Sequence, residues 1–91
     1  NVPGTFQVIP NVPEVISISA EVKEEQGIEG WSVSKVESKL GARVAMIDRQ
    51  DFDGKISVLD PNDVETILLG DRLYILLLKE HLKKLEKSLG S

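Results

Sequence analysis

The sequence predicts a two-layer α+β domain with the element order β-α-β-β-β-α, in which helices cover one face of a mostly antiparallel sheet. Residues 73–78 form an apolar run directly after the turn dipeptide Gly70-Asp71, which predicts a central strand buried on both faces. Residues 15–22 alternate between apolar and polar side chains, which predicts a strand with one face in water. Residues 82, 85 and 89 are all Leu, and this spacing predicts an amphipathic helix.

The first fourteen residues differ in composition from the rest of the chain. They hold three of the four prolines and a repeated Asn-Val-Pro triplet. Proline restricts itself and the residue before it to extended backbone, so residues 1–14 are expected to form a linker or an extended arm. Residues 15–91 are expected to form the domain. Because the chain begins with this stretch and has no initiator Met, we expect it to be part of a longer protein.

Each further element has a local signal. In the first strand Ile16, Ile18, Ala20 and Val22 share one face, and Ser17, Ser19 and Glu21 share the other. A helix is expected over residues 33–40, with Val33, Val36 and Leu40 on its apolar side. Ser32 is suited to cap its beginning, and Gly41 is suited to the left-handed residue that ends it.

The second half of the chain continues the strand pattern. Residues 42–47 are expected to form a strand, residues 51–54 a hairpin connection containing Asp-Gly, and residues 55–59 the next strand. Residues 62–69 are expected to be a loop or a single helical turn. The apolar strand then covers residues 72–79, and a helix covers residues 80–89 and ends at Gly90.

The composition narrows the classes of function. The 91 residues suit one domain, and the absence of cysteine removes disulfides and thiolate metal sites and fits a reducing cytosol. The net charge of −4 argues against nucleic acid as a partner, because phosphate binding needs a basic surface. The apolar run at 73–78 is far shorter than the ~20 residues that span a bilayer, so no direct membrane insertion is expected.

Several pieces in a fixed order resemble a known family. They are the helix opened by Gly30, the segment Val44-Ala45-Met46-Ile47-x-Arg49, Pro61, Ile67, and Gly70-Asp71 followed by x-Leu73. Over residues 15–85 the chain resembles the TrkA-C family, also called RCK-C. These domains are the regulatory lobes of cytoplasmic gating modules in potassium channels, potassium-uptake systems and some antiporters.

The resemblance implies a cytoplasmic domain that senses a ligand, forms a homodimer and gates ion flux. Its implied partners are an upstream RCK-N-like lobe and a membrane pore or transporter subunit, and the implied ligand of the parent protein is a divalent cation or an anionic nucleotide. The G-x-G-x-x-G fingerprint is absent, so no Rossmann-type binding of NAD is expected. We expect no enzyme activity, since the only histidine, His81, has no catalytic partner nearby in the sequence. Two alternatives stay open: a non-gating dimerisation domain of a transporter such as an antiporter, and a non-catalytic fragment of an enzyme.

Arg43, Asp48 and Arg49 are the candidate ligand-binding residues. The two arginines lie at either end of the predicted second strand and share a face if that strand is regular. Arginine suits bidentate capture of a carboxylate or phosphate, and the resemblance implies that this strand lies near a ligand-bearing dimer interface. The alternative is a salt bridge to Asp48, Asp51 or Glu21.

Glu21, Glu24 and Glu25 are the candidate metal ligands. They belong to an acidic cluster around the loop before the first helix, and carboxylate oxygens are the ligands that divalent cations such as Ca²⁺ prefer. The alternative is a charged loop in contact with water.

Overall fold

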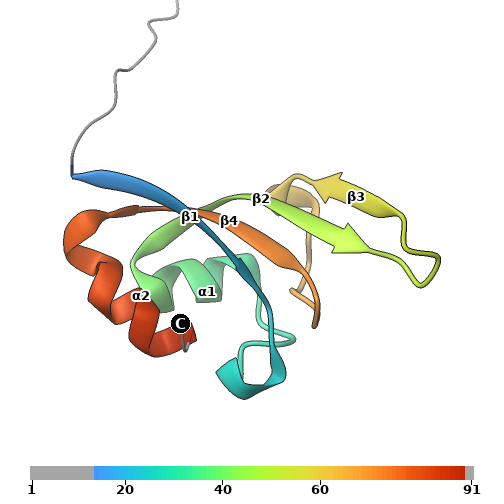
Figure 1. Cartoon of the computed structure of the whole chain (residues 1–91), viewed down its shortest axis with the longest axis horizontal. Coiled ribbons are helices and arrows are strands. Elements are labelled where there is room, and N and C mark those ends of the chain that lie inside the picture. Colours follow the sequence, from blue (N-terminus) through green and yellow to red (C-terminus); the bar gives the residue numbers. More distant parts are fainter. Residues whose placement is uncertain (1–13, 90–91) are drawn as a thin grey trace, which may run out of the picture.

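The structure, a computed structural model, describes residues 14–89. It is an α+β domain in which one four-stranded sheet has the strand order β1-β4-β2-β3 and every neighbouring pair is antiparallel. Both helices lie on the same side of the sheet (Figure 1). The predicted architecture and element order are therefore confirmed. The strands are β1 Val15–Glu21, β2 Ala42–Gln50, β3 Ile56–Leu59 and β4 Arg72–Leu78, the helices are α1 Val33–Leu40 and α2 Leu82–Leu89, and short 3₁₀ turns cover Glu24–Gln26, Pro61–Asp63 and Lys79–His81.

Helix α1 begins and ends at the predicted residues. The Oγ of Ser32 accepts a hydrogen bond from the Lys35 amide at 3.1 Å, which satisfies one of the free donors of the first turn. Gly41 has φ +63° and its amide donates to the Glu37 carbonyl at 2.9 Å, which ends the helix in the left-handed conformation. The apolar side of the helix is buried, as predicted from its spacing: Val33, Val36 and Leu40.

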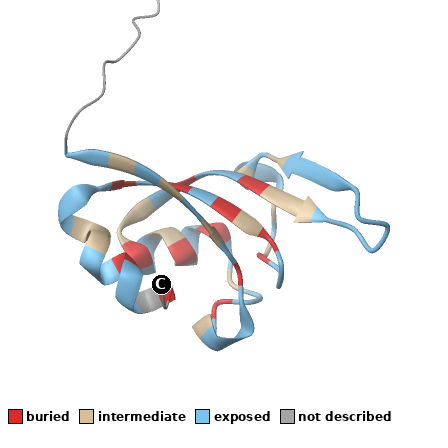
Figure 2. Cartoon of the chain, in the orientation of Figure 1, coloured by how far each residue is buried: buried red, intermediate tan, exposed pale blue. Residues whose placement is uncertain are grey.

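Strand β4 was predicted to be buried on both faces, and this prediction is wrong. Leu73, Ile75 and Leu77 are at most 4 % exposed, whereas the side chains between them are 36–43 % exposed. The helices lie on one face of the sheet, and buried and exposed residues alternate along β4 (Figure 2). The six-residue apolar run therefore supplies two surfaces, one in the core and one open.

The core lies between the sheet and the two helices. The strands contribute alternate residues, and Leu85 and Leu89 of α2 close the core on the helical side. At about 1.5–3 kcal/mol for each fully buried aliphatic side chain, this layer supplies the main stabilising free energy of the domain. The buried apolar residues are Val22, Ile28, Val33, Val36, Leu40, Val44, Ile47, Ile67, Leu73, Ile75, Leu77, Leu85 and Leu89.

Strand β2 is longer than predicted and is irregular. Val44 pairs with Ile75 and Met46 pairs with Tyr74, so Ala45 is an extra residue in the ladder. One extra residue reverses which face the following side chains occupy. Arg43 therefore lies on the open face, while Arg49 lies on the face that the helices cover. The expectation that they share a face is wrong, because it assumed a regular strand.

The β2–β3 hairpin forms as predicted and projects beyond the helices (Figure 1). The Asp51 carboxylate accepts hydrogen bonds from the amides of Asp53 and Lys55, each at 2.9 Å, and Gly54 has φ +85°. Phe52 at the tip is 99 % exposed.

The last helix is shorter than the predicted span. A 3₁₀ turn covers Lys79–His81, and α2 begins at Leu82. The prediction for Gly90 and most of the predicted linker at residues 1–14 fall outside the described residues. No helix in the described part of the chain has the length and apolar character that crossing a membrane requires.

Candidate functional site

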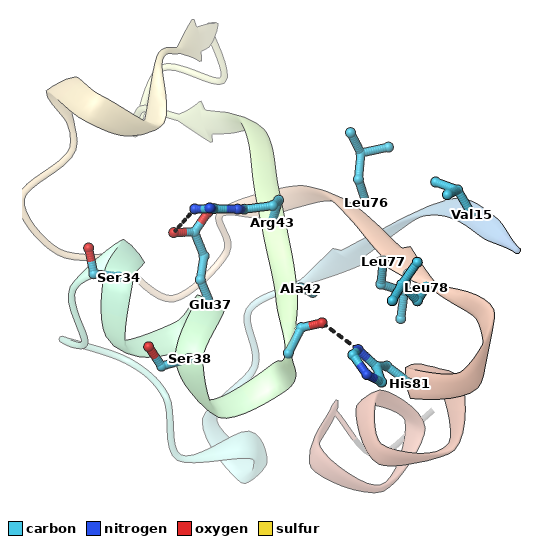
Figure 3. Close-up of a pocket in the computed structure, with 11 residues that line it drawn as sticks. Val15, Ser34, Glu37, Ser38, Ala42, Arg43, Leu76, Leu77, Leu78 and His81 are labelled. Atoms are coloured by element: carbon cyan, nitrogen blue, oxygen red, sulfur yellow. Dashed lines mark hydrogen bonds and ion pairs between the residues drawn. The ribbon is translucent and has the colours of Figure 1, made fainter. Parts of the chain in front are cut away.

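Two adjacent hollows open beside the first half of β2, where no strand within residues 14–89 pairs with its outer edge. The first has a volume of about 660 Å³ and lies between α1, the start of β2 and the end of β4 (Figure 3). The second has a volume of about 400 Å³ and lies beside the 3₁₀ turn at Pro61–Asp63. The two hollows share Ser34, Glu37 and Arg43, and we call them together the Arg43 cleft.

The two halves of the Arg43 cleft differ in chemistry. The first hollow has an apolar wall, with polar groups from α1 and from the turn before α2 on its rim. The second hollow is lined by hydroxyl, carboxylate and amide side chains. The apolar wall consists of Val15, Leu76, Leu77 and Leu78, the polar rim includes Ser34, Ser38 and His81, and the second hollow adds Ser32, Asp60 and Asn62.

Arg43 lies between the hollows with its guanidinium largely free. Its side chain is 83 % exposed, and its Nη1 lies 3.8 Å from the Oε1 of Glu37. An ion pair at this distance and exposure contributes at most about 1 kcal/mol, so an anionic ligand competes for the guanidinium at little cost. Arg43 is thus the predicted ligand residue that the structure places at a cleft.

Glu37 has a second contact that closes the free edge of β2. Its Oε2 accepts a hydrogen bond from the Val44 amide at 2.9 Å. The amide of a residue on an unpaired strand edge otherwise faces solvent and is open to another strand. The same carboxylate therefore orients Arg43 and blocks strand addition.

His81 connects the turn before α2 to the end of α1. Its Nδ1 lies 2.8 Å from the Gly41 carbonyl oxygen. A carbonyl oxygen only accepts hydrogen bonds, so Nδ1 carries the hydrogen. His81 was expected to lie in the last helix, with no catalytic partner nearby in the sequence. Its neighbour lies forty positions away in the chain, and no local pattern indicates that contact.

Two of the three guanidinium nitrogens of Arg49 donate hydrogen bonds inside the domain. Its Nε and Nη2 donate to the Asp71 carboxylate at 3.0 and 2.8 Å, and Nη2 also donates to the Thr66 carbonyl at 3.1 Å. The hydrogen bond to Asp71 raises the pKa of Arg49 above its ordinary value. Asp71 is 1 % exposed and also accepts from the Leu68 amide at 2.9 Å. Arg49 therefore forms a salt bridge, as the alternative expected, but its partner is Asp71 and not Asp48, Asp51 or Glu21.

Asp48 lies on the open face of the sheet, apart from both arginines. It accepts a hydrogen bond from the Tyr74 hydroxyl at 2.6 Å, and this bond raises the pKa of Tyr74. Arg43, Asp48 and Arg49 therefore lie in three different surroundings. They are not brought together as one ligand-binding set.

The candidate metal ligands are not assembled either. The Oε1 of Glu21 lies 3.9 Å from the Nη2 of Arg72, and Glu24 and Glu25 belong to an exposed 3₁₀ turn. Within residues 14–89 no group of three or more His, Asp or Glu side chains lies close enough together to hold a metal ion.

Comparison of the chain with protein-family models and with curated proteins finds no match. The resemblance to the TrkA-C family stays a prediction.

Proposed function

We propose that this chain is a non-catalytic regulatory domain of the TrkA-C kind, which senses an anionic small molecule in the cytoplasm and gates a potassium channel or potassium-uptake system. The observation that carries the proposal is the position of Arg43. Its side chain is 83 % exposed and lies between two hollows at the free edge of the sheet. An exposed cation at the rim of an apolar wall suits a ligand with one anionic and one apolar part.

The chemistry of the Arg43 cleft favours a nucleotide-like ligand. A phosphate or carboxylate binds the Arg43 guanidinium, and the apolar wall accepts a flat ring. The hydroxyls of Ser34 and Ser38 lie on the same rim and are able to donate to the ligand. The cleft is bordered by α1, β2 and the turn before α2, so a ligand in it contacts all three of these elements at once.

Such a ligand regulates a partner only if it favours one arrangement of these elements over another. Binding in the cleft restricts α1 relative to the turn before α2. In the proposed role, this restricted arrangement changes how the domain contacts an RCK-N-like lobe, and that change opens or closes a membrane pore or transporter subunit.

The proposal is tested by thermal melting and calorimetry of the chain with ATP, a cyclic dinucleotide, inorganic phosphate and calcium chloride. A ligand present at 100 times its dissociation constant stabilises the folded state by about 2.7 kcal/mol. We expect a nucleotide to raise the melting temperature and Arg43→Ala to abolish that rise. Lys55→Ala is the matched control, because it removes one positive charge from the exposed hairpin, away from the cleft.

Two results would contradict the proposal. If no anionic compound raises the melting temperature, the proposal that the chain senses such a ligand is wrong. If a compound raises it equally in Arg43→Ala, the ligand binds somewhere other than the Arg43 cleft. Potassium flux of the parent protein with and without Arg43→Ala then separates a gating domain from a non-gating domain of an antiporter.

A further inference from the structure

Strand β1 lies at one edge of the sheet, and no strand within residues 14–89 pairs with its outer side. At one end of β1 the Val22 amide donates to the Asp71 carbonyl at 2.7 Å. At the other end the Lys79 amide donates to the Glu14 carbonyl at 2.6 Å. In an antiparallel pair every second residue directs its amide and carbonyl away from the partner strand. The residues of β1 whose backbone groups point outward are therefore Val15, Ser17, Ser19 and Glu21.

The outer edge of β1 is blocked only at its end. The Nε2 of Gln26 donates to the Glu21 carbonyl at 3.0 Å, which agrees with an outward direction for that carbonyl. Within the described residues, the outward backbone groups of Ser17 and Ser19 have no partner. The edge of β2 differs, because there a glutamate side chain holds the Val44 amide. Free amides and carbonyls on a strand edge are a template for one more strand.

The helical side of β1 is also incompletely covered. The core residues of β4 are at most 4 % exposed, whereas their neighbours on β1 are only partly buried: Ile16, Ile18 and Ala20. A hollow of about 330 Å³ opens beside this edge, and apolar residues of β1 and α2 belong to its lining: Ile18, Ala20, Leu85 and Leu89. An added strand with apolar side chains on the helical side would complete the core at this edge.

The chain itself contains a segment of this kind. Residues 5–9 lie before the described part of the chain and read Thr-Phe-Gln-Val-Ile. Phe6 and Val8 alternate with the polar Thr5 and Gln7, which is the pattern of a strand with one apolar face. The segment contains no proline, and residues 1–13 contain no Asp, Glu, Lys or Arg, so burying it at an edge displaces no charge.

We propose that residues 5–9 add to the outer edge of β1 as a fifth, antiparallel strand. Thr5 then lies beside Ser19, Gln7 beside Ser17 and Ile9 beside Val15. Residues 10–14 connect the two strands, and five residues that include two prolines and an asparagine suit a hairpin loop. A parallel strand would need a connection of a dozen or more residues, which the segment lacks.

Side-chain chemistry selects this register. It places Phe6 beside Ile18 and Val8 beside Ile16, all on the helical side. A shift of one residue would move the apolar pair to the opposite face and turn Gln7 towards the core.

Shifts of two residues also fail. In one direction Pro3 would lie beside Ser19, where a backbone donor is needed and proline has none. In the other direction Thr5 would lie beside Glu21, whose carbonyl already accepts from Gln26.

The docked segment leaves the proposed ligand site open. It extends the sheet beyond β1, whereas Arg43 lies on β2, and β4 separates these two strands. The chain before Thr5 leaves the domain beside Ser19, ~13 Å along β1 from Val15. An RCK-N-like lobe would then attach near that end of the strand. This last statement rests on the proposed function, and the docking itself does not.

Amide hydrogen exchange measured by NMR on the 91-residue chain tests the docking. We expect the outward amides of Ser17 and Ser19 to exchange about 100-fold or more slowly than in an open strand, because residues 5–9 accept their hydrogen bonds. The inward amides of Ile16 and Ile18 are bonded to β4 in either case, so they report whether the domain is folded.

Two double variants carry the same added charge on opposite faces of the segment. Phe6→Asp with Val8→Asp should abolish the protection of Ser17 and Ser19 and leave that of Ile16 and Ile18 intact. Thr5→Asp with Gln7→Asp is the matched control and should keep the protection, because these side chains face water. Equal effects of the two double variants would overturn the proposed face.

Paired cysteines test the register, and the chain has no cysteine of its own. Gln7→Cys with Ser17→Cys should form a disulfide on mild oxidation, since directly opposite Cα atoms lie about 5.5 Å apart. Gln7→Cys with Ser19→Cys should not, because diagonal neighbours lie about 7–8 Å apart. The reverse result would overturn the register.

Two results would overturn the docking itself. One is rapid exchange of the Ser17 and Ser19 amides in the wild type. The other is protection that appears only at high protein concentration, because a different chain then occupies the edge. A chain that binds a nucleotide but leaves these amides unprotected contradicts only the docking, and a protected chain that binds no anionic compound contradicts only the proposed function.

Discussion

Arg49 donates to both carboxylate oxygens of Asp71, at 3.0 and 2.8 Å, and so joins the end of β2 to the start of β4. The same turn is held from the other side, because the Val22 amide donates to the Asp71 carbonyl at 2.7 Å and the Gly70 amide donates to the Val22 carbonyl at 2.9 Å. Gly70-Asp71, which carries much of the family resemblance, is therefore a structural junction of three strands.

Removing this carboxylate should destabilise the domain strongly. We expect Asp71→Ala to lower the free energy of unfolding by about 3 kcal/mol, since it leaves the Arg49 guanidinium and the Leu68 amide without their partner. The Arg49 side chain is 31 % exposed, so water offsets part of a larger loss. Urea unfolding measures the difference.

The Arg72–Glu21 pair is the control for this junction. The Nη2 of Arg72 lies 3.9 Å from the Oε1 of Glu21, and the two side chains are 43 % and 47 % exposed. We therefore expect Arg72→Lys to change the free energy of unfolding by less than about 0.5 kcal/mol. Equal effects of Asp71→Ala and Arg72→Lys would show that the Arg49–Asp71 pair has no special role.

Gly41→Ala should destabilise the domain more than Gly27→Ala. Both glycines have positive φ, +63° and +70°, and an alanine there costs about 1–2 kcal/mol. A Cβ at Gly41 would also lie 3.1 Å from the His81 Nδ1, whereas a Cβ at Gly27 meets nothing within 4 Å. Thermal unfolding measures how much more stability Gly41→Ala loses than Gly27→Ala, and this difference reflects the contact between the end of α1 and the turn before α2. Equal losses would mean that His81 moves aside freely.

Tyr74 should titrate above the ordinary tyrosine pKa of about 10. Its hydroxyl donates to Asp48 at 2.6 Å, which favours the protonated phenol and raises the pKa. Because the pKa of Tyr74 is higher in the folded than in the unfolded state, its hydrogen bond to Asp48 contributes its full stabilisation below the unfolded-state pKa. This stabilisation is lost as the pH rises through the folded-state pKa.

The titration of Tyr74 is directly measurable, because the chain has one tyrosine. The absorbance of tyrosinate should appear at higher pH in the wild type than in Asp48→Ala. Superimposable titration curves would show that the hydrogen bond does not form in solution.

Glu37→Ala should make the chain prone to association through the β2 edge. It frees the Val44 amide that Glu37 holds at 2.9 Å, and an unpaired edge is a template for another strand. We expect light scattering to rise with concentration and time. Glu37→Gln keeps an acceptor oxygen and should stay close to the wild type, and equal scattering from both variants would exclude the edge as the cause.

The parts of the fold that were predicted well depend on residues close together in the chain. Ser32 caps α1 three residues away, and Gly41 ends it through a bond to Glu37. Asp51 holds its own turn in the same way. Alternation along β1 places its apolar residues on the core side without reference to any other strand.

The candidate site was predicted less well. Arg43 lies at a cleft, but Arg49 does not join it, because the extra residue at Ala45 turns Arg49 to the face that the helices cover. Asp48 shares the open face with Arg43 but lies farther along β2, opposite Arg72. Composition and spacing do not reveal a bulge of this kind. Its position depends on how β2 pairs with β4.

The sequence by itself determined the order and type of the elements, the ends of α1 and the hairpin turn, since these follow from periodicity and from hydrogen bonds between near neighbours. Only the tertiary structure decided that one face of β4 stays open, that Arg49 pairs with Asp71 and that His81 meets Gly41. These contacts join residues far apart in the chain. No periodicity or spacing along the chain indicates which distant residues meet, so these contacts follow only from the way the strands and helices pack.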